Sequence, residues 1–323
     1  MTCTNLRKLR MWGSLIGGVV GDAYGANYEF KARDTYSASD NMEYNTVFNI
    51  PAGSFTDDSS MMLCLADSLA EKRTFDPYDQ MKKYARWRDN LDYSSVPERG
   101  CFDIGRTTKL AIANFMFDEQ NKENKEKQVK YYGLDGTYDS GNGGIMRLAP
   151  IPIFYWKDIY MSMNYSSLSS KVTHMSEECL DCAALMGLFI SLFIKGYTKA
   201  GILVFIKKYI RNLSQKVQEI ADATFLNKTR NSIESSGYVV HSLEAALWSF
   251  YKTNTFEDGM KICANLGRDT DTICCIYGQI AGSCYSIENI PEKWISALQR
   301  KEYIFSIFKK FIAVVSICDD TIN

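Results

Sequence analysis

Four glycines recur at every fourth position near the start of the chain, at Gly13, Gly17, Gly21 and Gly25. Residues four apart lie on the same face of an α-helix, so this spacing predicts a helix with one face made of glycine. Such a face allows the backbone of a second helix to approach closely. Tight packing of this segment against another helix is therefore the first constraint on the fold.

An apolar run over residues 11–20 follows several basic residues, a combination that also occurs in signal peptides. Asp22 ends the run at once, and the glycine spacing favours a helix of the folded protein instead. No apolar run reaches the ~18 residues that a membrane span needs. The longest, residues 182–194, is predicted to be a buried core helix, and we expect no membrane association.

Helical periodicity dominates the rest of the chain. Apolar residues repeat with the spacing of one helix face within residues 62–69, 185–193, 202–210, 243–250 and 303–317. Only residues 44–50 alternate as a strand would, and that stretch is short. Six prolines in 323 residues also favour long helices. The sequence therefore predicts an all-α fold.

The length of 323 residues is near the upper limit for a single hydrophobic core. Residues 121–130 are almost wholly polar and charged, and they are the only plausible internal break. Candidate site motifs lie on both sides of this segment. We therefore expect one domain over residues 1–323.

Charge and cysteine content bear on partners and compartment. A net charge of −1 gives no reason to expect a nucleic-acid partner. The ten cysteines are scattered, and several lie in apolar stretches, unlike the framework of a small disulfide-rich protein. We expect reduced cysteines and a cytoplasmic protein. A zinc site made from Cys179, Cys182 and His174 is an alternative use of two of them.

The first cluster of oxygen-bearing side chains is Thr56, Asp57, Asp58 and Ser59, ahead of an apolar helix. Carboxylate and hydroxyl oxygens suit hard cations such as Mg²⁺ or Mn²⁺. The same residue types also cap helix N-termini, where acids are favoured by the helix dipole. Taken alone, the cluster favours the capping interpretation.

A second cluster, residues 269–272, has the sequence Asp-Thr-Asp-Thr and also precedes apolar residues. Helix capping is again an alternative. Together, however, the two clusters supply four carboxylates and four hydroxyls, which covers what two neighbouring hard cations require. Two such clusters in one chain strengthen the hypothesis of a metal site.

Residues 140–147 form a third motif, in which Gly141, Gly143 and Gly144 surround Asn142 ahead of Arg147. Glycines expose backbone N–H groups that can bind anions. The motif is neither a Walker loop nor a dinucleotide fingerprint, because Gly-Lys-Ser/Thr is absent and Met146 replaces the third glycine. A flexible loop is the alternative. Glu29 adds a carboxylate that could activate water.

Taken in order, six segments resemble the signatures of the ADP-ribosylglycohydrolase family. They are residues 21–25 with Glu29, then 56–59, 102–105, 141–147, 173–174 and 267–272. The resemblance implies a compact all-α fold with orthogonally packed helices and a site for two divalent cations, Mg²⁺ or Mn²⁺. The metal ligands that it implies are Thr56, Asp57, Asp58, Asp269, Asp271 and Thr272. The catalytic residues that it implies are Glu29, Asp58 and Asp103. The ADP-ribose-binding residues that it implies are Gly141, Asn142, Gly143, Gly144, Met146, Arg147 and His174.

The implied function is metal-dependent hydrolysis of the bond between ADP-ribose and a modified protein side chain. The match at residues 102–105 favours arginine as that side chain. The partner would be an ADP-ribosylated protein or a small ADP-ribosyl compound, and the chain would be a monomer. The alternatives are an inactive ADP-ribose-binding module of the same fold, a structural protein, and a hydrolase of another phosphorylated ribose compound. The retained acids favour the enzyme.

Two positions depart from the family's signatures. Ser59 stands where the family has threonine, but it keeps the hydroxyl. Arg268 places a cation next to Asp269. If its side chain points inward, it competes with metal for that carboxylate. If it points outward, it reaches substrate or solvent.

Overall fold

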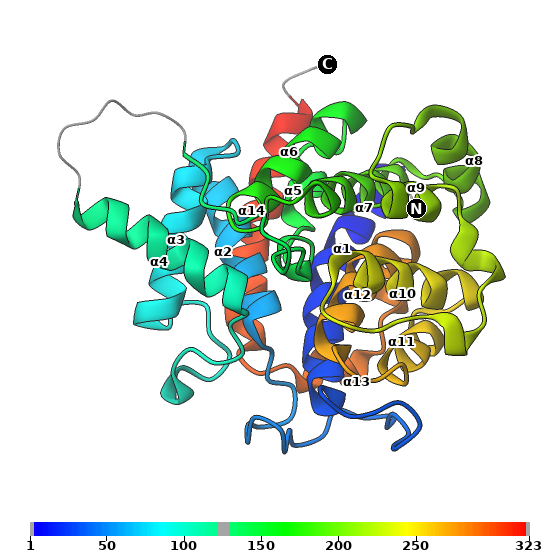
Figure 1. Cartoon of the computed structure of the whole chain (residues 1–323), viewed down its shortest axis with the longest axis horizontal. Coiled ribbons are helices and arrows are strands. Elements are labelled where there is room, and N and C mark those ends of the chain that lie inside the picture. Colours follow the sequence, from blue (N-terminus) through cyan, green and yellow to red (C-terminus); the bar gives the residue numbers. More distant parts are fainter. Residues whose placement is uncertain (1–2, 122–129, 321–323) are drawn as a thin grey trace.

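A computed structural model describes residues 3–121 and 130–320. This part of the chain is helical and contains no β-strand, which confirms the predicted fold class (Figure 1). The charged segment at residues 121–130 lies almost entirely outside the described residues. The α-helices are α1 (Cys3–Gly25), α2 (Asp57–Lys72), α3 (Pro77–Asn90), α4 (Arg106–Gln120), α5 (Pro150–Phe154), α6 (Ile159–Lys171), α7 (Glu177–Lys195), α8 (Lys199–Tyr209), α9 (Gln215–Ala221), α10 (Val239–Lys252), α11 (Phe256–Ala264), α12 (Thr270–Tyr285), α13 (Glu292–Ala297) and α14 (Lys301–Asp320).

Helix α1 runs through the middle of the molecule beside α12 (Figure 1). A Cβ atom added at Gly21 would collide with the carbonyl group of Cys274, and one at Gly17 would collide with the carbonyl of Gly278. The predicted glycine face therefore contacts the backbone of α12. The contacts run antiparallel, so that the last turn of α1 meets the first residues of α12. Tight packing thus brings two candidate site segments together.

The apolar run at residues 182–194 forms most of α7, which is buried on all sides, as predicted. The Ser176 hydroxyl accepts a hydrogen bond from the Cys179 amide and starts the helix. Gly196, in a left-handed conformation with φ of 99°, ends it. Among the described helices, none is both long and apolar enough to cross a membrane.

Residues 44–50, the one candidate strand, form a turn in which Asn45 and Ile50 exchange two backbone hydrogen bonds of 3.0 and 3.1 Å. The stretch is too short to add further pairs.

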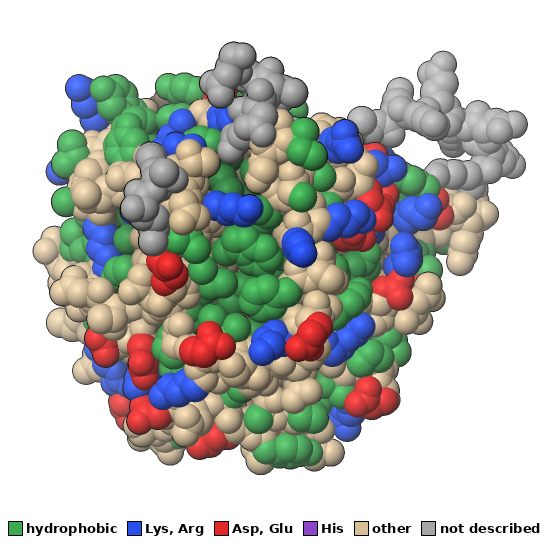
Figure 2. Space-filling model, turned by 180° about the vertical axis from the view of Figure 1, so that it is seen from behind, with side chains coloured by type: hydrophobic (Ala, Val, Ile, Leu, Met, Phe, Trp, Pro, Cys, Tyr) green, Lys and Arg blue, Asp and Glu red, His purple; other side chains and the backbone are tan. Residues whose placement is uncertain are grey.

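The surface of the molecule carries both positive and negative side chains. Figure 2 shows Lys and Arg side chains interspersed with Asp and Glu around a central group of hydrophobic side chains on one face. Neither positive nor negative side chains predominate on that face.

Ion pairs attach the C-terminal helix to the core. Lys310 on α14 contacts Asp67 on α2 at 2.9 Å, and Lys83 on α3 contacts the same carboxylate at 2.7 Å. The hydroxyl of Tyr93 donates a third hydrogen bond to Asp67, also at 2.7 Å. Because Lys83 is buried, its charge depends on Asp67 and on Glu71, which lies 3.0 Å away. The network fixes α2, and with it the cluster at the start of α2.

Candidate functional site

The first acidic cluster lies at the start of α2, where a carboxylate from another helix takes the capping position. Asp22 on α1 is fully buried and accepts hydrogen bonds from the Thr56 amide at 3.0 Å and the Ser59 amide at 2.9 Å. It also accepts bonds from the Thr56 and Ser59 hydroxyls, at 2.8 and 2.5 Å. Thr56 itself makes no side-chain capping bond. Asp22 therefore satisfies the helix N-terminus that Thr56 or Asp57 would otherwise cap.

This arrangement leaves Asp57 and Asp58 available for another partner. Asp58 Oδ1 is buried and makes no hydrogen bond to any described residue. Its second oxygen accepts a long bond of 3.3 Å from the Thr56 hydroxyl. Buried polar atoms without partners are costly in a native protein. Capping therefore does not explain why these acids are there.

The second cluster lies at the start of α12. Asp269 occupies the capping position of this helix but makes no side-chain capping bond. Its Oδ2 instead accepts a hydrogen bond of 2.7 Å from Asn142, in the glycine-rich motif. Asp271 Oδ1 is buried and has no hydrogen-bond partner among the described residues. The capping interpretation fails here too.

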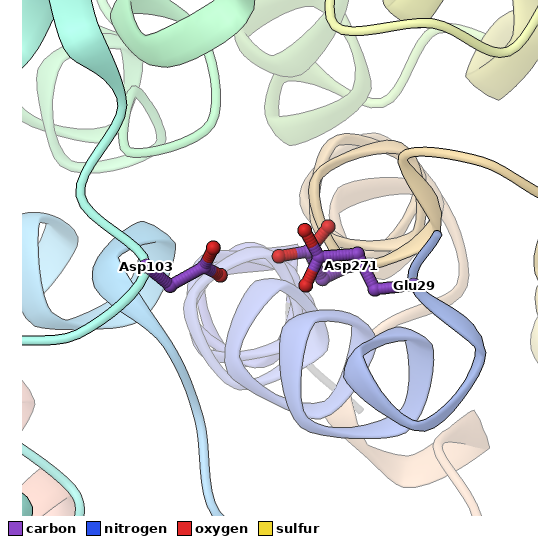
Figure 3. A group of neighbouring side chains, drawn as sticks. All are labelled: Glu29, Asp103 and Asp271. Atoms are coloured by element: carbon purple, nitrogen blue, oxygen red, sulfur yellow. The ribbon is translucent and has the colours of Figure 1, made fainter. Parts of the chain in front are cut away.

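Glu29 and Asp103 join Asp271 in one group of carboxylates. One oxygen from each lies within 4.8 Å of the others. In Figure 3, Glu29 and Asp271 lie next to each other and Asp103 points toward them from the opposite side. Glu29 Oε2 and Asp103 Oδ2 are also buried without hydrogen-bond partners in the described chain. The three acids converge on a common point, although they come from segments far apart in the sequence.

Burial governs the electrostatics of this group. It raises the pKa of Asp103 to about 7 and, together with the nearby Asp103 charge, the pKa of Glu29 to about 10. Burial also raises the pKa of Asp57 and of Asp271 well above the usual range. So many carboxyl groups cannot ionise together in a buried site without added positive charge.

The described residues that line the cavity do not supply enough of that positive charge. Among the described residues that line the cavity, the cationic side chains are Arg106 and Arg268. Arg106 contacts Asp139 at 2.5 Å, and Arg268 contacts Glu234 at 2.8 Å. Hard divalent cations fit the site because they prefer oxygen ligands and would neutralise the carboxylates. The remaining zinc alternative is not supported, since Cys179, Cys182 and His174 form no metal-binding group within the described residues.

The acids open into a cavity of about 770 Å³. Of the candidate site residues, it is lined by Glu29, Asp57, Asp103, Gly141, Asn142, Gly143, Met146, His174, Asp269, Asp271 and Thr272. The other candidates, Thr56, Asp58, Gly144 and Arg147, are buried beside it and do not line it. A cavity of this size accommodates a ligand as large as a nucleotide.

Arg147 lies behind the glycine-rich motif. Its guanidinium donates hydrogen bonds to the Gly143 carbonyl and, at 2.7 Å, to the Thr173 hydroxyl. It is fully buried and lies over the ring of Tyr84, with its Cζ atom 4.9 Å from the ring centroid. The structure therefore places Arg147 where it holds the motif in shape, with no surface of its own in the cavity.

His174 contacts the same motif from the side of the cavity. A Cβ atom at Gly143 would lie 2.6 Å from His174 Cε1, so the ring fits only against glycine. The Thr173 hydroxyl and His174 Nδ1 lie 2.8 Å apart. Burial lowers the pKa of His174 to about 3, with the Arg147 charge adding to the effect. His174 therefore presents a neutral ring to the cavity.

Arg268 points outward, which settles the question that its position raised. Its side chain pairs with Glu234, while Asp269 is held by Asn142. Its backbone, with φ of 66°, accepts a bond from the Phe30 amide at 2.7 Å and donates one to the Lys31 carbonyl at 2.8 Å. This pair of bonds fastens the Glu29 segment to the start of α12.

Sequence reasoning missed several residues of the site. The sequence analysis used Asp22 only as the end of an apolar run and as part of a family signature, although a lone acid in a glycine-lined apolar helix is a signal of its own. Phe30, Ser236 and Gly237, which no motif included, also line the cavity. Nothing in their local sequence indicates that they meet there, because their proximity arises from tertiary packing.

Comparison with known proteins agrees with this geometry. The family model for ADP-ribosylglycohydrolase matches residues 4–319. The chain is 34% identical over 298 residues to the ADP-ribosylarginine hydrolase Tri1 of Pseudomonas putida, covering 91% of this chain and 76% of the relative. It is 32% identical over 295 residues to Tri1 of Serratia proteamaculans, with the same coverage. A solved structure of an ADP-ribosylglycohydrolase-related protein complex is similar with a TM-score of 0.81 at 29% identity, covering 96% of this chain and 99% of that one. The chain therefore belongs to the ADP-ribosylglycohydrolase family, as the sequence motifs indicated.

Proposed function

We propose that this chain hydrolyses the bond between ADP-ribose and an arginine side chain of a protein, with two divalent cations in the acidic site. The convergence of Glu29, Asp103 and Asp271 on one buried point of the cavity carries the proposal. Two relatives that cover 91% of the chain are named ADP-ribosylarginine hydrolases, and this supports arginine as the linkage.

The residues that would hold the cations are those whose oxygens lack a partner within the described chain or face the cavity. They are Asp57, Asp58, Asp269 and Asp271, with the hydroxyl of Thr272. The Thr56 hydroxyl would join them because it lies 3.3 Å from Asp58 Oδ2, although it also bonds to Asp22. When bound, the cations would supply positive charge and Lewis acidity toward oxygen ligands. They would also allow the surrounding carboxyl groups to ionise at neutral pH.

The protein's own residues would orient the substrate. The backbone N–H groups of Gly141 and Gly143, which line the cavity, would receive the diphosphate, supported from behind by Arg147. The neutral ring of His174 would contact the ADP-ribose. These groups fix the anomeric carbon of the ribose close to the carboxylates.

Glu29 is the carboxylate that we assign to proton transfer. Cleavage of the C–N bond gives an oxocarbenium-like state, as in glycoside hydrolysis. Glu29 would take a proton from the attacking water as the new C–O bond forms. The departing guanidine nitrogen would receive that proton, and the products would be ADP-ribose and an intact arginine side chain. Asp103, on the opposite side of the group, would stabilise the developing positive charge.

The test is release of ADP-ribose from two matched peptides, one ADP-ribosylated on arginine and one on serine. Each would be incubated with Mg²⁺, with Mn²⁺ and with chelator. We expect release from the arginine-linked peptide that stops in chelator. Release from the serine-linked peptide alone would contradict the proposal that the substrate linkage is to arginine. Equal release in chelator would contradict the proposed role of the cations.

A further inference from the structure

Three aromatic side chains from three separate loops form a row at the edge of the cavity, here called the aromatic rim. The ring centroids of Phe30 and Phe48 lie 6.2 Å apart with the planes at 68°. Those of Phe48 and Phe102 lie 5.6 Å apart with the planes at 46°. Phe30 and Phe102 line the cavity itself. The rim therefore connects loops that are distant in the sequence.

The rim lies beside two of the three converging acids. Phe30 directly follows Glu29, and Phe102 directly precedes Asp103. Both acids belong to the group whose oxygens lie within 4.8 Å of one another. The aromatic surface is thus next to the place where the proposed bond breaks, and Phe48 bridges the two sides.

Phe30 is in an arrangement that folding alone does not favour. Its side chain is 70% exposed, and its backbone has φ of 62°, in the left-handed region. The backbone is nevertheless fixed by its bond to the Arg268 carbonyl at 2.7 Å. Exposed apolar surface and left-handed backbone both cost free energy, and both concentrate at ligand sites. An exposed phenyl ring on a hydrogen-bonded backbone at the edge of a cavity indicates a ligand contact.

The chemistry next to the rim defines what it would bind. Aromatic faces carry negative charge density and attract flat cations, above all the guanidinium group, which also stacks on them. The neighbouring carboxylates favour a cation as well. The two cationic side chains that line the cavity are paired with other acids and do not occupy this surface.

We propose that the aromatic rim receives the guanidinium of the ADP-ribosylated arginine, with Phe30 stacked on it. The inference rests on the proposed function, because it specifies the linkage at the same site. A serine-linked substrate offers no flat cation, so the rim would select for arginine. Phe30 is then a specificity-determining residue that acts on substrate binding and leaves proton transfer to Glu29.

The experiment compares Phe30→Ala, Phe30→Leu and Phe30→Tyr with the wild type on the matched arginine-linked and serine-linked peptides. Tyr160→Ala is the control, since Tyr160 is 74% exposed on α6 and does not line the cavity. Binding of free ADP-ribose and of the intact peptides would be measured by calorimetry with Mg²⁺ present.

We expect Phe30→Ala and Phe30→Leu to raise KM for the arginine-linked peptide by roughly three- to thirtyfold, the range for loss of a cation–π contact. We expect kcat and the Kd of free ADP-ribose to change less than about twofold. Phe30→Tyr should keep the wild-type KM, because it keeps the aromatic face. Tyr160→Ala should match the wild type.

Two results would overturn the proposed role of the aromatic rim. One is an equal loss of free ADP-ribose binding in Phe30→Ala, which would assign the ring to the nucleotide. The other is no change in KM or in peptide binding. A wild type that releases no ADP-ribose from the arginine-linked peptide would refute the proposed function. In that case, selective weakening of the binding of the intact arginine-linked peptide by Phe30→Ala would still support the role of the aromatic rim, and unchanged binding would contradict it.

Discussion

Asp22 accepts hydrogen bonds from both the backbone amide and the hydroxyl of Ser59, at 2.9 and 2.5 Å, and so joins α1 to the first turn of α2. Through this contact a buried acid of the central helix fixes the backbone that carries Asp57 and Asp58. Because Asp22 itself is fully enclosed, its role is to position these acids and not to meet substrate. Ser59, which stands where the family has threonine, makes this contact through its hydroxyl.

Asp22→Asn tests this positioning. The amide nitrogen would face donors, and at least one buried N–H or O–H group would lose its acceptor. We expect the free energy of unfolding to fall by about 1–3 kcal/mol. We also expect a higher Mg²⁺ concentration for half-maximal activity. Denaturant unfolding and a Mg²⁺ titration of activity measure the two effects.

Ser60→Ala is the matched control, because the Ser60 hydroxyl bonds only to the Thr56 carbonyl within its own helix. It should leave the Mg²⁺ requirement unchanged. If Asp22→Asn unfolded at the same denaturant concentration and needed no more Mg²⁺ than this control, Asp22 would not position the site.

Gly21→Ala tests the packing of α1 against α12. The added Cβ would meet the backbone of Cys274, which cannot move aside as a flexible side chain would. We expect a loss of about 1–3 kcal/mol in the free energy of unfolding, typical of overpacking. Gly105→Ala is the comparison, because Gly105 has φ of −60° and no atom lies within 4 Å of its added Cβ. Its loss should stay below about 1 kcal/mol. Equal losses in the two variants would contradict the packing argument.

The helices and both acidic clusters could be predicted from sequence because their signals are local. Glycine spacing, apolar periodicity and runs of acids each occupy a few consecutive residues, and residues 56–59 and 269–272 do lie at helix starts. The cap on α2 could not be assigned, since it is Asp22 from another helix. Local sequence offered Thr56 or Asp57 for that role.

The edge of the site is a product of packing between loops. Phe30, Phe48 and Phe102 are separated by 18 or more residues along the chain, and no periodicity connects them. Similarly, the direction of the Arg268 side chain depends on Glu234, which lies in a different segment. Single-sequence patterns carry no information on such pairs, whereas the order of the family signatures anticipated that the acids belong to one site.

Neutral His174 gives a prediction about pH. Its pKa in the folded protein is about 3, below its ordinary value of 6.5, so the unfolded chain binds more protons between these values. The stability that it contributes is full above pH 6.5 and is lost as the pH falls toward 3. Between pH 8 and pH 5, the wild type should lose about 2 kcal/mol more than His174→Gln. Denaturant unfolding of both proteins at the two pH values measures the difference, and parallel losses would show that His174 is not held neutral.

Glu29→Gln separates proton transfer from the rest of the site. The substitution keeps the size of the side chain but removes the base. We expect kcat to fall by about 10²–10⁴-fold, with ADP-ribose binding in the presence of Mg²⁺ unchanged within about threefold. Single-turnover kinetics measures the rate of the chemical step, and calorimetry measures the Kd of ADP-ribose. Full turnover in Glu29→Gln would transfer the role to another carboxylate, and Asp103→Asn would be examined next.

The central claim is that the buried carboxyl groups converge to bind cations that the protein itself does not supply. Calorimetric titration of the wild type with Mn²⁺ at pH 7, in buffers of different ionisation enthalpy, tests it most directly. Burial raises the pKa of Asp103 to about 7 and that of Glu29 to about 10, so protons occupy the group at this pH and must leave when a cation binds. The account predicts saturable binding with proton release, an affinity that rises from pH 6 to pH 8, and loss of binding in Asp57→Asn. Absence of saturable binding, or binding that releases no protons and is unchanged in Asp57→Asn, would contradict it.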